Sequence, residues 1–225
     1  MAPRTIVFDL DGTLVDTAPD LIGSLNVLFA REGLAPITLE EGLGLVGAGV
    51  KPLIARGLAA QGRVLAAAQL DALYADYVAY YAEHIADGSR PYPGVEAALD
   101  VLAARGSRLA VCTNKLTSLS VRLLDRLGLS QRFVIICGPD TFGVQKPDPE
   151  VLRRTILAAD GDPADAVMVG DSATDIRTAQ AAGVPVVAVD FGYTDVPVSE
   201  LGPDRVISHF DALPEAVGAL ARNPA

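Results

Sequence analysis

The sequence predicts an α/β protein, with a doubly wound, Rossmann-like parallel sheet as its core and an inserted helical cap domain. Short apolar runs typical of buried strands alternate with helical patterns along most of the chain. The alternation stops between about residues 17 and 85, where helical patterns rich in Ala and Leu follow one another. Because alternating strands and helices form parallel sheets covered on both faces, we expect an α/β core of residues 1–16 plus 86–225 and a helical cap of residues 17–85.

The expected elements follow from local patterns. Six apolar runs predict strands at 5–9, 108–113, 133–137, 166–170, 184–189 and 205–208. Three helical patterns between them end at a glycine, which is common just after a helix C-terminus: 95–105, 118–127 and 173–182. The Pro- and Gly-containing segment at 91–94 marks the return from the helical stretch to the alternating region.

Composition limits the function classes. The 225 residues are 50% hydrophobic, and 18 basic against 28 acidic residues give a net charge of −10. That charge argues against nucleic acid or an anionic membrane as a partner. Cys112 and Cys137 lie in apolar runs and are expected to be reduced core residues. No signal peptide or membrane-spanning run is recognisable, so a cytoplasmic location is expected; the sequence leaves the oligomeric state open.

Two carboxylates follow the first expected strand. The apolar run at 6–8 leads into Asp9 and Asp11, and Gly12 opens the turn. Strand side chains alternate between faces, so residues two apart can converge just past the strand end. Close carboxylates repel, and each resists ionisation while the other is charged. Such a pair requires a cation, a shared proton or a reaction that uses both protonation states; an Asp-capped turn is the structural alternative.

Other polar side chains follow later strands. Thr113 and Asn114 precede a helix whose first amides are suited to hold an anion, with simple helix capping as the alternative. Lys146 precedes a proline, which favours an extended backbone. A lysine fixed beside carboxylates would reduce their repulsion and bind phosphate, whereas a solvated surface lysine is the common alternative.

A second acidic pair follows the strand at 166–170. If Ser172 caps the next helix, Asp175 lies in its first turn and faces the same pocket as Asp171. Hard oxygen ligands of this kind suit Mg²⁺, and a capping box is the alternative use of Asp175. In an open α/β sheet, ligands bind outside the carboxyl ends of the strands, so all these groups are expected to converge.

The four motifs together resemble those of the haloacid dehalogenase-like superfamily, specifically its Mg²⁺-dependent phosphatases. The matching segments stand in the family's order: Asp9-Leu10-Asp11-Gly12-Thr13, Thr113-Asn114, Lys146-Pro147 and Gly170-Asp171-x-x-x-Asp175. The resemblance covers the whole chain, including a helical cap inserted after the first motif. It implies a phosphoric monoester hydrolase that uses Mg²⁺ and acts on a small-molecule phosphate ester.

The resemblance also implies catalytic roles. Asp9 is the expected nucleophile, which forms an aspartyl-phosphate, and Asp11 is the expected general acid and base. Thr113, Asn114 and Lys146 are the expected phosphate-binding groups, and Lys146 also steadies Asp9. Because Asp9 and a phosphoryl group are both negative, attack requires cations that screen them.

The metal ligands implied by the resemblance are Asp9, the main-chain carbonyl of Asp11, and Asp171. Asp175 either binds Mg²⁺ through water or pairs with Lys146, and the sequence leaves both open. The second aspartate, Asp11, argues against dehalogenation, because the dehalogenases of the superfamily lack it.

Within the superfamily, the chain is similar to the phosphatases that convert 2-phosphoglycolate to glycolate and phosphate. The similarity rests on the segments 113–115, 192–193, 203–207 and the cap run 46–56, in which Ala48 stands where Asn is expected. Lys51 or Arg56 in that run is the expected partner of the substrate carboxylate when the cap closes. A solvated helix residue is the alternative for Arg56.

Three other functions stay open at this point. A mutase resembling β-phosphoglucomutase shares every core motif and differs in its cap and product. A phosphatase of sugar phosphates or of pyrophosphate has the same core chemistry. A non-catalytic sensor of phosphorylated metabolites is disfavoured, because such a protein has no need of both Asp9 and Asp11.

Overall fold

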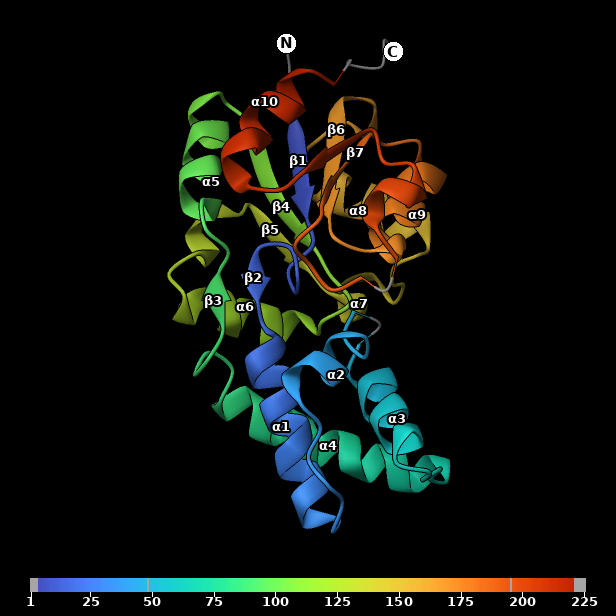
Figure 1. Cartoon of the computed structure of the whole chain (residues 1–225). Helices are drawn as coiled ribbons and strands as arrows, with labels where there is room; N and C mark the ends of the chain where they lie inside the picture. Colours follow the sequence, from blue (N-terminus) through green and yellow to red (C-terminus); the bar gives the residue numbers. More distant parts are fainter. Residues whose placement is uncertain (1–3, 48, 195, 221–225) are drawn as a thin grey trace.

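A six-stranded parallel sheet forms the centre of the computed structural model, which describes residues 4–47, 49–194 and 196–220 (Figure 1). The strand order is β5-β4-β1-β6-β7-β8, so the first strand lies near the middle. The strands are β1 (Thr5–Phe8), β4 (Arg108–Cys112), β5 (Ile135–Cys137), β6 (Ala166–Gly170), β7 (Val186–Val189) and β8 (Arg205–Ile207). The predicted doubly wound α/β core is confirmed.

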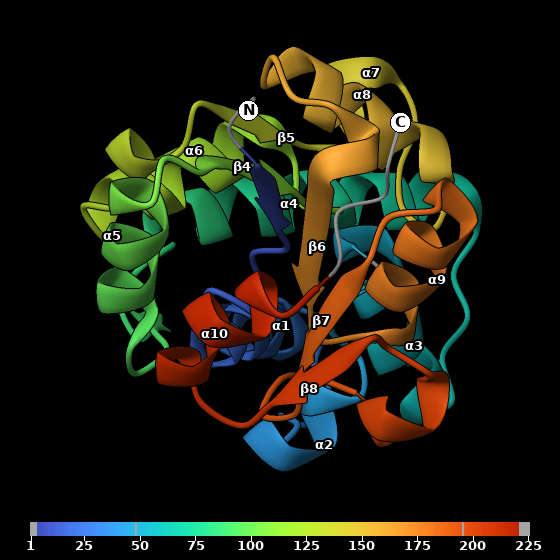
Figure 2. The same ribbon diagram turned by 90° about the horizontal axis from the view of Figure 1, so that it is seen from above.

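Helices cover both faces of this sheet (Figure 2). Ile6 and Phe8 of β1 belong to one apolar cluster and Val7 to another, as the alternation of strand side chains requires. The first cluster includes residues of α5 (Val95–Ala104), α6 (Thr117–Arg126) and α10 (Leu213–Gly218). The second includes residues of α8 (Pro149–Ala158) and α9 (Ala173–Ala182), and the short α7 (Pro139–Phe142) packs beside α6 and α8. Cys112 and Cys137 are free and buried, as predicted.

Four helices lie beyond the carboxyl ends of the strands, below the sheet in Figure 1. They are α1 (Ala18–Arg31), α2 (Leu39–Leu43), α3 (Val50–Ala60) and α4 (Ala67–Glu83). Helix α4 packs against α1 and α3, and buried side chains of these helices join the same apolar cluster as Ile6 and Phe8. These helices occupy the predicted helical stretch. The division into a core (1–16 plus 86–225) and a cap (17–85) stays a prediction.

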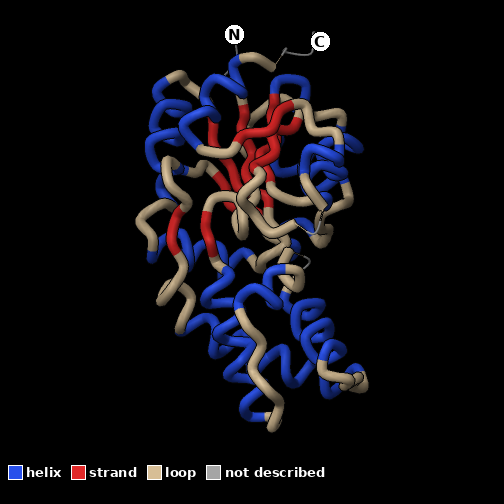
Figure 3. The backbone as a smooth tube through the Cα atoms, viewed as in Figure 1, coloured by secondary structure: helices blue, strands red, loops and turns tan. Residues whose placement is uncertain are grey.

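Two short strands that the sequence did not predict connect the helices to the sheet. β2 (Val15–Asp16) and β3 (Arg90–Pro91) form an antiparallel pair between the sheet and the helices (Figure 3). Val15 is paired with Pro91. Each is two residues long, too short for a hydrophobic period to register. Among the described helices, none is long and apolar enough to cross a membrane.

Candidate active site

The first acidic pair lies where β1 ends. The Asp9 amide extends the strand by donating to the Val169 carbonyl of β6 at 2.9 Å. The chain then turns at Gly12, whose φ is +81°. A Cβ at Gly12 would lie 2.4 Å from Asp171 Oδ2, a distance that Cβ atoms essentially never show. Glycine is therefore required for the loop that carries Asp11 to pass against Asp171.

The second acidic pair lies where β6 ends. Ser172 is the N-cap of α9, and its Oγ donates to Asp175 Oδ2 at 2.6 Å within a capping box. Asp171 accepts hydrogen bonds from Thr13 Oγ1 and from the Tyr193 amide, both at 2.7 Å. Asp175 therefore has both predicted roles. It forms the capping box with Ser172, and its carboxylate also belongs to the acidic cluster.

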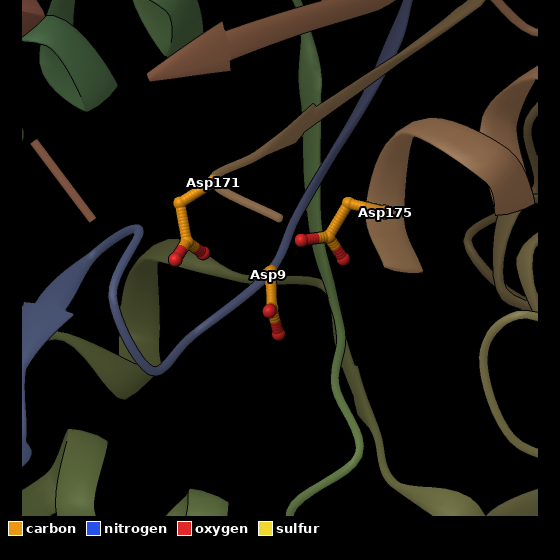
Figure 4. Close-up of side chains that lie close together, drawn as sticks. All are labelled: Asp9, Asp171 and Asp175. Atoms are coloured by element: carbon orange, nitrogen blue, oxygen red, sulfur yellow. The ribbon is translucent and has the colours of Figure 1, made fainter. Parts of the chain in front are cut away.

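Asp9, Asp171 and Asp175 converge from these two strand ends (Figure 4). One carboxylate oxygen of each lies within 4.8 Å of the others. Burial raises the pKa of Asp9 to about 7, against the lowering effect of Lys146 and with a further rise from Asp175. Burial and the charges of Asp175 and Asp9 also raise the pKa of Asp171 well above its ordinary value. Three hard oxygen donors this close together fit a divalent cation.

These shifts predict how stability depends on pH in the presence of EDTA. With its pKa raised from 3.8 to about 7, folded Asp9 keeps a proton that the unfolded chain has lost. Its contribution to stability is therefore complete below the unfolded pKa and disappears as the pH rises through the folded pKa. We expect the Tm to fall more steeply from about pH 5 to about pH 7.5 in the wild type than in Asp9→Asn. Parallel Tm curves for the two proteins would contradict this.

Lys146 lies between two of these carboxylates. Its Nζ is 2.9 Å from Asp9 Oδ1 and 2.6 Å from Asp175 Oδ1, and the side chain is buried. Burial alone would lower the lysine pKa, but Asp175 and Asp9 outweigh it and raise the pKa above its ordinary value. The structure therefore brings Asp175 to Lys146, which is one of the two alternatives that the sequence left open.

Asn114 orients Lys146 through its backbone. The Asn114 Nδ2 donates to the Lys146 carbonyl at 3.1 Å, and the Lys146 amide donates to Asn114 Oδ1 at 3.0 Å. This reciprocal pair gives Asn114 a positioning role that sequence reasoning missed, and its contact with phosphate stays a prediction. Thr113, the other residue of that motif, is buried beside the cavity, and its Oγ1 accepts from the Lys115 amide at 3.2 Å.

Lys115 is a site residue that sequence reasoning missed. Its Nζ lies 2.8 Å from Asp11 Oδ1 and 3.1 Å from Oδ2, and the lysine is only 6% exposed. The ammonium also lies over the ring of Tyr81 on α4, 4.7 Å from the ring centroid. Lys115 therefore joins the acidic loop after β1 to the helical segment.

A cavity of about 220 Å³ lies between the carboxyl ends of the strands and the helical segment. Its core side includes Asp9, Asp11, Thr113, Asn114 and Lys115, and its helical side includes Val46, Val50, Lys51, Leu53 and Tyr74. The chain has three lysines, and all three are here: two line the cavity and Lys146 contacts Asp9. Lysine is rare in this chain, whose other basic residues are arginines. That rarity is the signal that could have identified Lys115 as a site residue.

The two cap residues proposed for substrate binding differ in position. Lys51 lines the cavity, but its Nζ pairs with Asp71 Oδ1 at 2.6 Å and its side chain is 50% exposed. Arg56 is exposed on α3 and does not contribute to the cavity lining, which agrees with the solvated alternative. Ala48, the departure from the expected Asn, lies outside the described residues.

Tyr193 ties the acidic cluster to the start of α1. Its amide donates to Asp171, and its hydroxyl donates to Asp16 Oδ1. The same hydroxyl oxygen accepts from the amides of Thr17 and Ala18, at 2.7 and 2.9 Å. Thr17 is the N-cap of α1 and Ala18 its first residue, and amides at this end of a helix have no partner within it. A single hydroxyl therefore provides hydrogen bonds to two amides and one carboxylate where the chain enters the helical segment.

Removing that hydroxyl is expected to lower stability. Tyr193→Phe leaves two buried amides and one carboxylate without their partner, so we expect the free energy of unfolding to fall by about 1–3 kcal/mol. Urea denaturation measures the change. Tyr80→Phe is the matched control, because it keeps the ring that stacks on His84 and the Tyr80 hydroxyl has no hydrogen bond within the described ranges. Equal stability of the two variants would contradict the role of Tyr193.

The site combines an acidic cluster, a buried lysine between two of its carboxylates and a cavity at the carboxyl ends of parallel strands. The model of the haloacid dehalogenase-like hydrolase family matches residues 6–189, a range that includes every one of these groups. The chain belongs to that family, as its four motifs predicted, and it is an enzyme of the hydrolase class.

Several relatives of high identity are named phosphoglycolate phosphatases. A phosphoglycolate phosphatase of Mesorhizobium japonicum is 51% identical over 213 residues, which cover 95% of this chain and 94% of the relative. A phosphoglycolate phosphatase of Caulobacter vibrioides is 48% identical and covers 94% and 90% of the two chains. The crystal structure of a predicted phosphoglycolate phosphatase from Haemophilus somnus superposes with a TM-score of 0.88 at 29% identity, and covers 95% and 97% of the two chains.

Proposed function

We propose that this enzyme hydrolyses 2-phosphoglycolate to glycolate and phosphate. The observation that carries the proposal is the position of Asp9, which faces the cavity beside Asp11 and lies 2.9 Å from the ammonium of Lys146. A carboxylate held against a cation at the mouth of a small cavity is suited to attack a phosphate ester. The names of the relatives that share about half of its residues support 2-phosphoglycolate as the ester.

The proposed reaction has two displacements at phosphorus. An Asp9 carboxylate oxygen attacks the phosphorus while the bond to the ester oxygen breaks, and Asp11 gives that oxygen a proton. Asp11 then takes a proton from the water that attacks the aspartyl-phosphate, which releases phosphate and restores Asp9. Lys146 screens the charges that meet in both steps, and Thr113 lies beside the cavity as a donor to phosphate oxygens.

The residues around Asp9 fit Mg²⁺ as the cofactor. Asp9, Asp171 and the main-chain carbonyl of Asp11 are the proposed ligands, and the pairing of Asp175 with Lys146 makes contact through water its proposed mode. When bound, Mg²⁺ would offset the repulsion between Asp9 and the phosphoryl oxygens. Asp9 and Asp171, the two proposed carboxylate ligands, carry two negative charges when ionised, which one such ion cancels.

The cavity also supports a small substrate. Its volume of about 220 Å³ is below the range typical of sites for drug-sized ligands. In a protein with a net charge of −10, an anionic ester requires cations at the site, which Lys115, Lys146 and a bound Mg²⁺ would provide.

The test is phosphate release from a panel of esters at several Mg²⁺ concentrations. The panel contains 2-phosphoglycolate, several sugar phosphates and pyrophosphate. We expect the highest kcat/KM for 2-phosphoglycolate and loss of activity with EDTA. Preference for another ester would contradict the proposed substrate, and an isomerised sugar phosphate in place of free phosphate would identify a mutase.

A further inference from the structure

We propose that Lys115 binds the carboxylate of the substrate, and so selects phosphate esters that carry a carboxylate next to the ester carbon. This inference rests on the proposed function and assigns its anion specificity to a residue of the sheet core rather than to the helical segment. Three observations carry it: where the ammonium lies, which of its donors are used, and how the other candidate cations are placed.

The ammonium lies at the right distance from the reacting centre. Lys115 Nζ is 2.8 Å from Asp11 Oδ1. A general acid must lie about 2.6–3.2 Å from the ester oxygen that it protonates. The ammonium is then within about 6 Å of that oxygen, the sum of the two contacts. In 2-phosphoglycolate a single methylene separates the ester oxygen from the carboxylate, so a carboxylate directed toward Lys115 reaches its ammonium.

The Lys115 ammonium also has an N–H group available for a further acceptor. An ammonium carries three N–H groups, and Asp11 is its one acceptor within the described ranges. The ring of Tyr81 covers another side without accepting a conventional hydrogen bond. Burial of the lysine increases the strength of any further ion pair, because little water competes for the charge.

Lys115 also positions Asp11. In this structure the Asp11 carboxylate is engaged by Lys115 through both oxygens. An N–H of the ammonium that Asp11 does not use can take the substrate carboxylate while Asp11 stays in place beside the ester oxygen. Lys115 thereby places the substrate carboxylate and Asp11 on one ammonium.

The other candidate cations, Lys51, Arg56 and Lys146, are less suited to bind the substrate carboxylate. Lys51 is half exposed and already paired with Asp71, so a contact with substrate there is screened by water. Arg56 lies outside the cavity lining. Lys146 is held between Asp9 and Asp175, next to the phosphoryl position rather than beyond the ester oxygen.

The experiment compares two esters that differ in the carboxylate alone: 2-phosphoglycolate and 2-hydroxyethyl phosphate. For Lys115→Met we expect kcat/KM to fall about 100-fold for 2-phosphoglycolate and less than about 10-fold for 2-hydroxyethyl phosphate. Lys115→Arg should keep most of the wild-type preference. Lys51→Met is the matched comparison. We expect it to lower kcat/KM by the same factor for both esters.

An equal fall for both esters in Lys115→Met would overturn the inference and leave Lys115 as a positioning residue for Asp11. If the wild type itself shows no preference for 2-phosphoglycolate, the proposed function fails as well. The two failures are therefore distinguishable. Failure of the inference is seen in Lys115→Met, and failure of the proposed function is seen in the wild type.

A measurement on the wild type keeps the inference testable if Lys115→Met does not fold. Protein labelled with ¹³C at the lysine Cε gives three lysine signals, one for each lysine of the chain. The signals are assigned with Lys51→Arg and Lys115→Arg. Added glycolate should shift the Lys115 signal most, whereas ethylene glycol should leave it in place. An unshifted Lys115 signal at saturating glycolate would overturn the inference.

Discussion

Replacement of Asp9 by asparagine should lower kcat by at least about 10⁴-fold, because the amide is not a nucleophile toward phosphorus. The substitution keeps the shape of the side chain and leaves Lys146 and Asp175 in place. Rapid acid quench with ³²P-labelled ester should trap labelled protein in the wild type and none in Asp9→Asn. Both the rate and the trapped label report on the same covalent step.

Asp125→Asn is the control for this experiment, since Asp125 is exposed on α6 and absent from the cavity lining. It should keep the wild-type rate and label. Phosphate release that survives in Asp9→Asn would refute Asp9 as the nucleophile.

Lys146→Met has the second-largest expected effect, because it acts on both stability and rate. Without the ammonium, Asp9 and Asp175 are buried near each other with no cation between them. Removing one partner of a buried ion pair costs about 3–5 kcal/mol, so we expect a loss of this size at neutral pH. Loss of the charge beside the phosphoryl position should lower kcat a further 10²–10³-fold, about the effect of removing one electrostatic donor.

Urea denaturation at two pH values separates this effect from a simple packing defect. The stability lost in Lys146→Met should shrink in acid, where the two carboxyls are protonated and no longer repel. Arg122→Met, which removes an exposed cation from α6, should change neither stability nor kcat. A loss of stability that is independent of pH would point to packing rather than charge.

The sequence predicted the place of the site because of strand topology. Asp9, Thr113 and Asp171 each follow an apolar run, and parallel strands bring their carboxyl ends to one edge of a sheet. The bounds of α9 were predicted from local signals. The helix runs from Ala173 to Ala182 as predicted, with Ser172 as its N-cap and Gly183 just after its last residue. These features depend on a few neighbouring residues, and for that reason they can be read from the chain.

The features that could not be predicted join residues far apart in the chain. Lys115 meets Asp11 across 104 positions, and Tyr193 meets Asp16 across 177. Such contacts depend on the path of loops and on rotamers set by tertiary packing, for which periodicity has no signature. The role of Asn114 was missed for the same reason, because its partner is the backbone of Lys146 and not a side chain.

The ribbon of β2 and β3 makes the helical segment, in topological terms, a replaceable loop of the core. Val15 and Pro91 are paired neighbours, so the intervening chain leaves and re-enters the core at one point. Insertions whose ends lie together can be exchanged without altering the strand order of their host. Evolution can therefore vary the cover of the cavity while the acidic cluster is inherited unchanged. Because Lys115 belongs to the host, its share of substrate choice would persist through such exchanges.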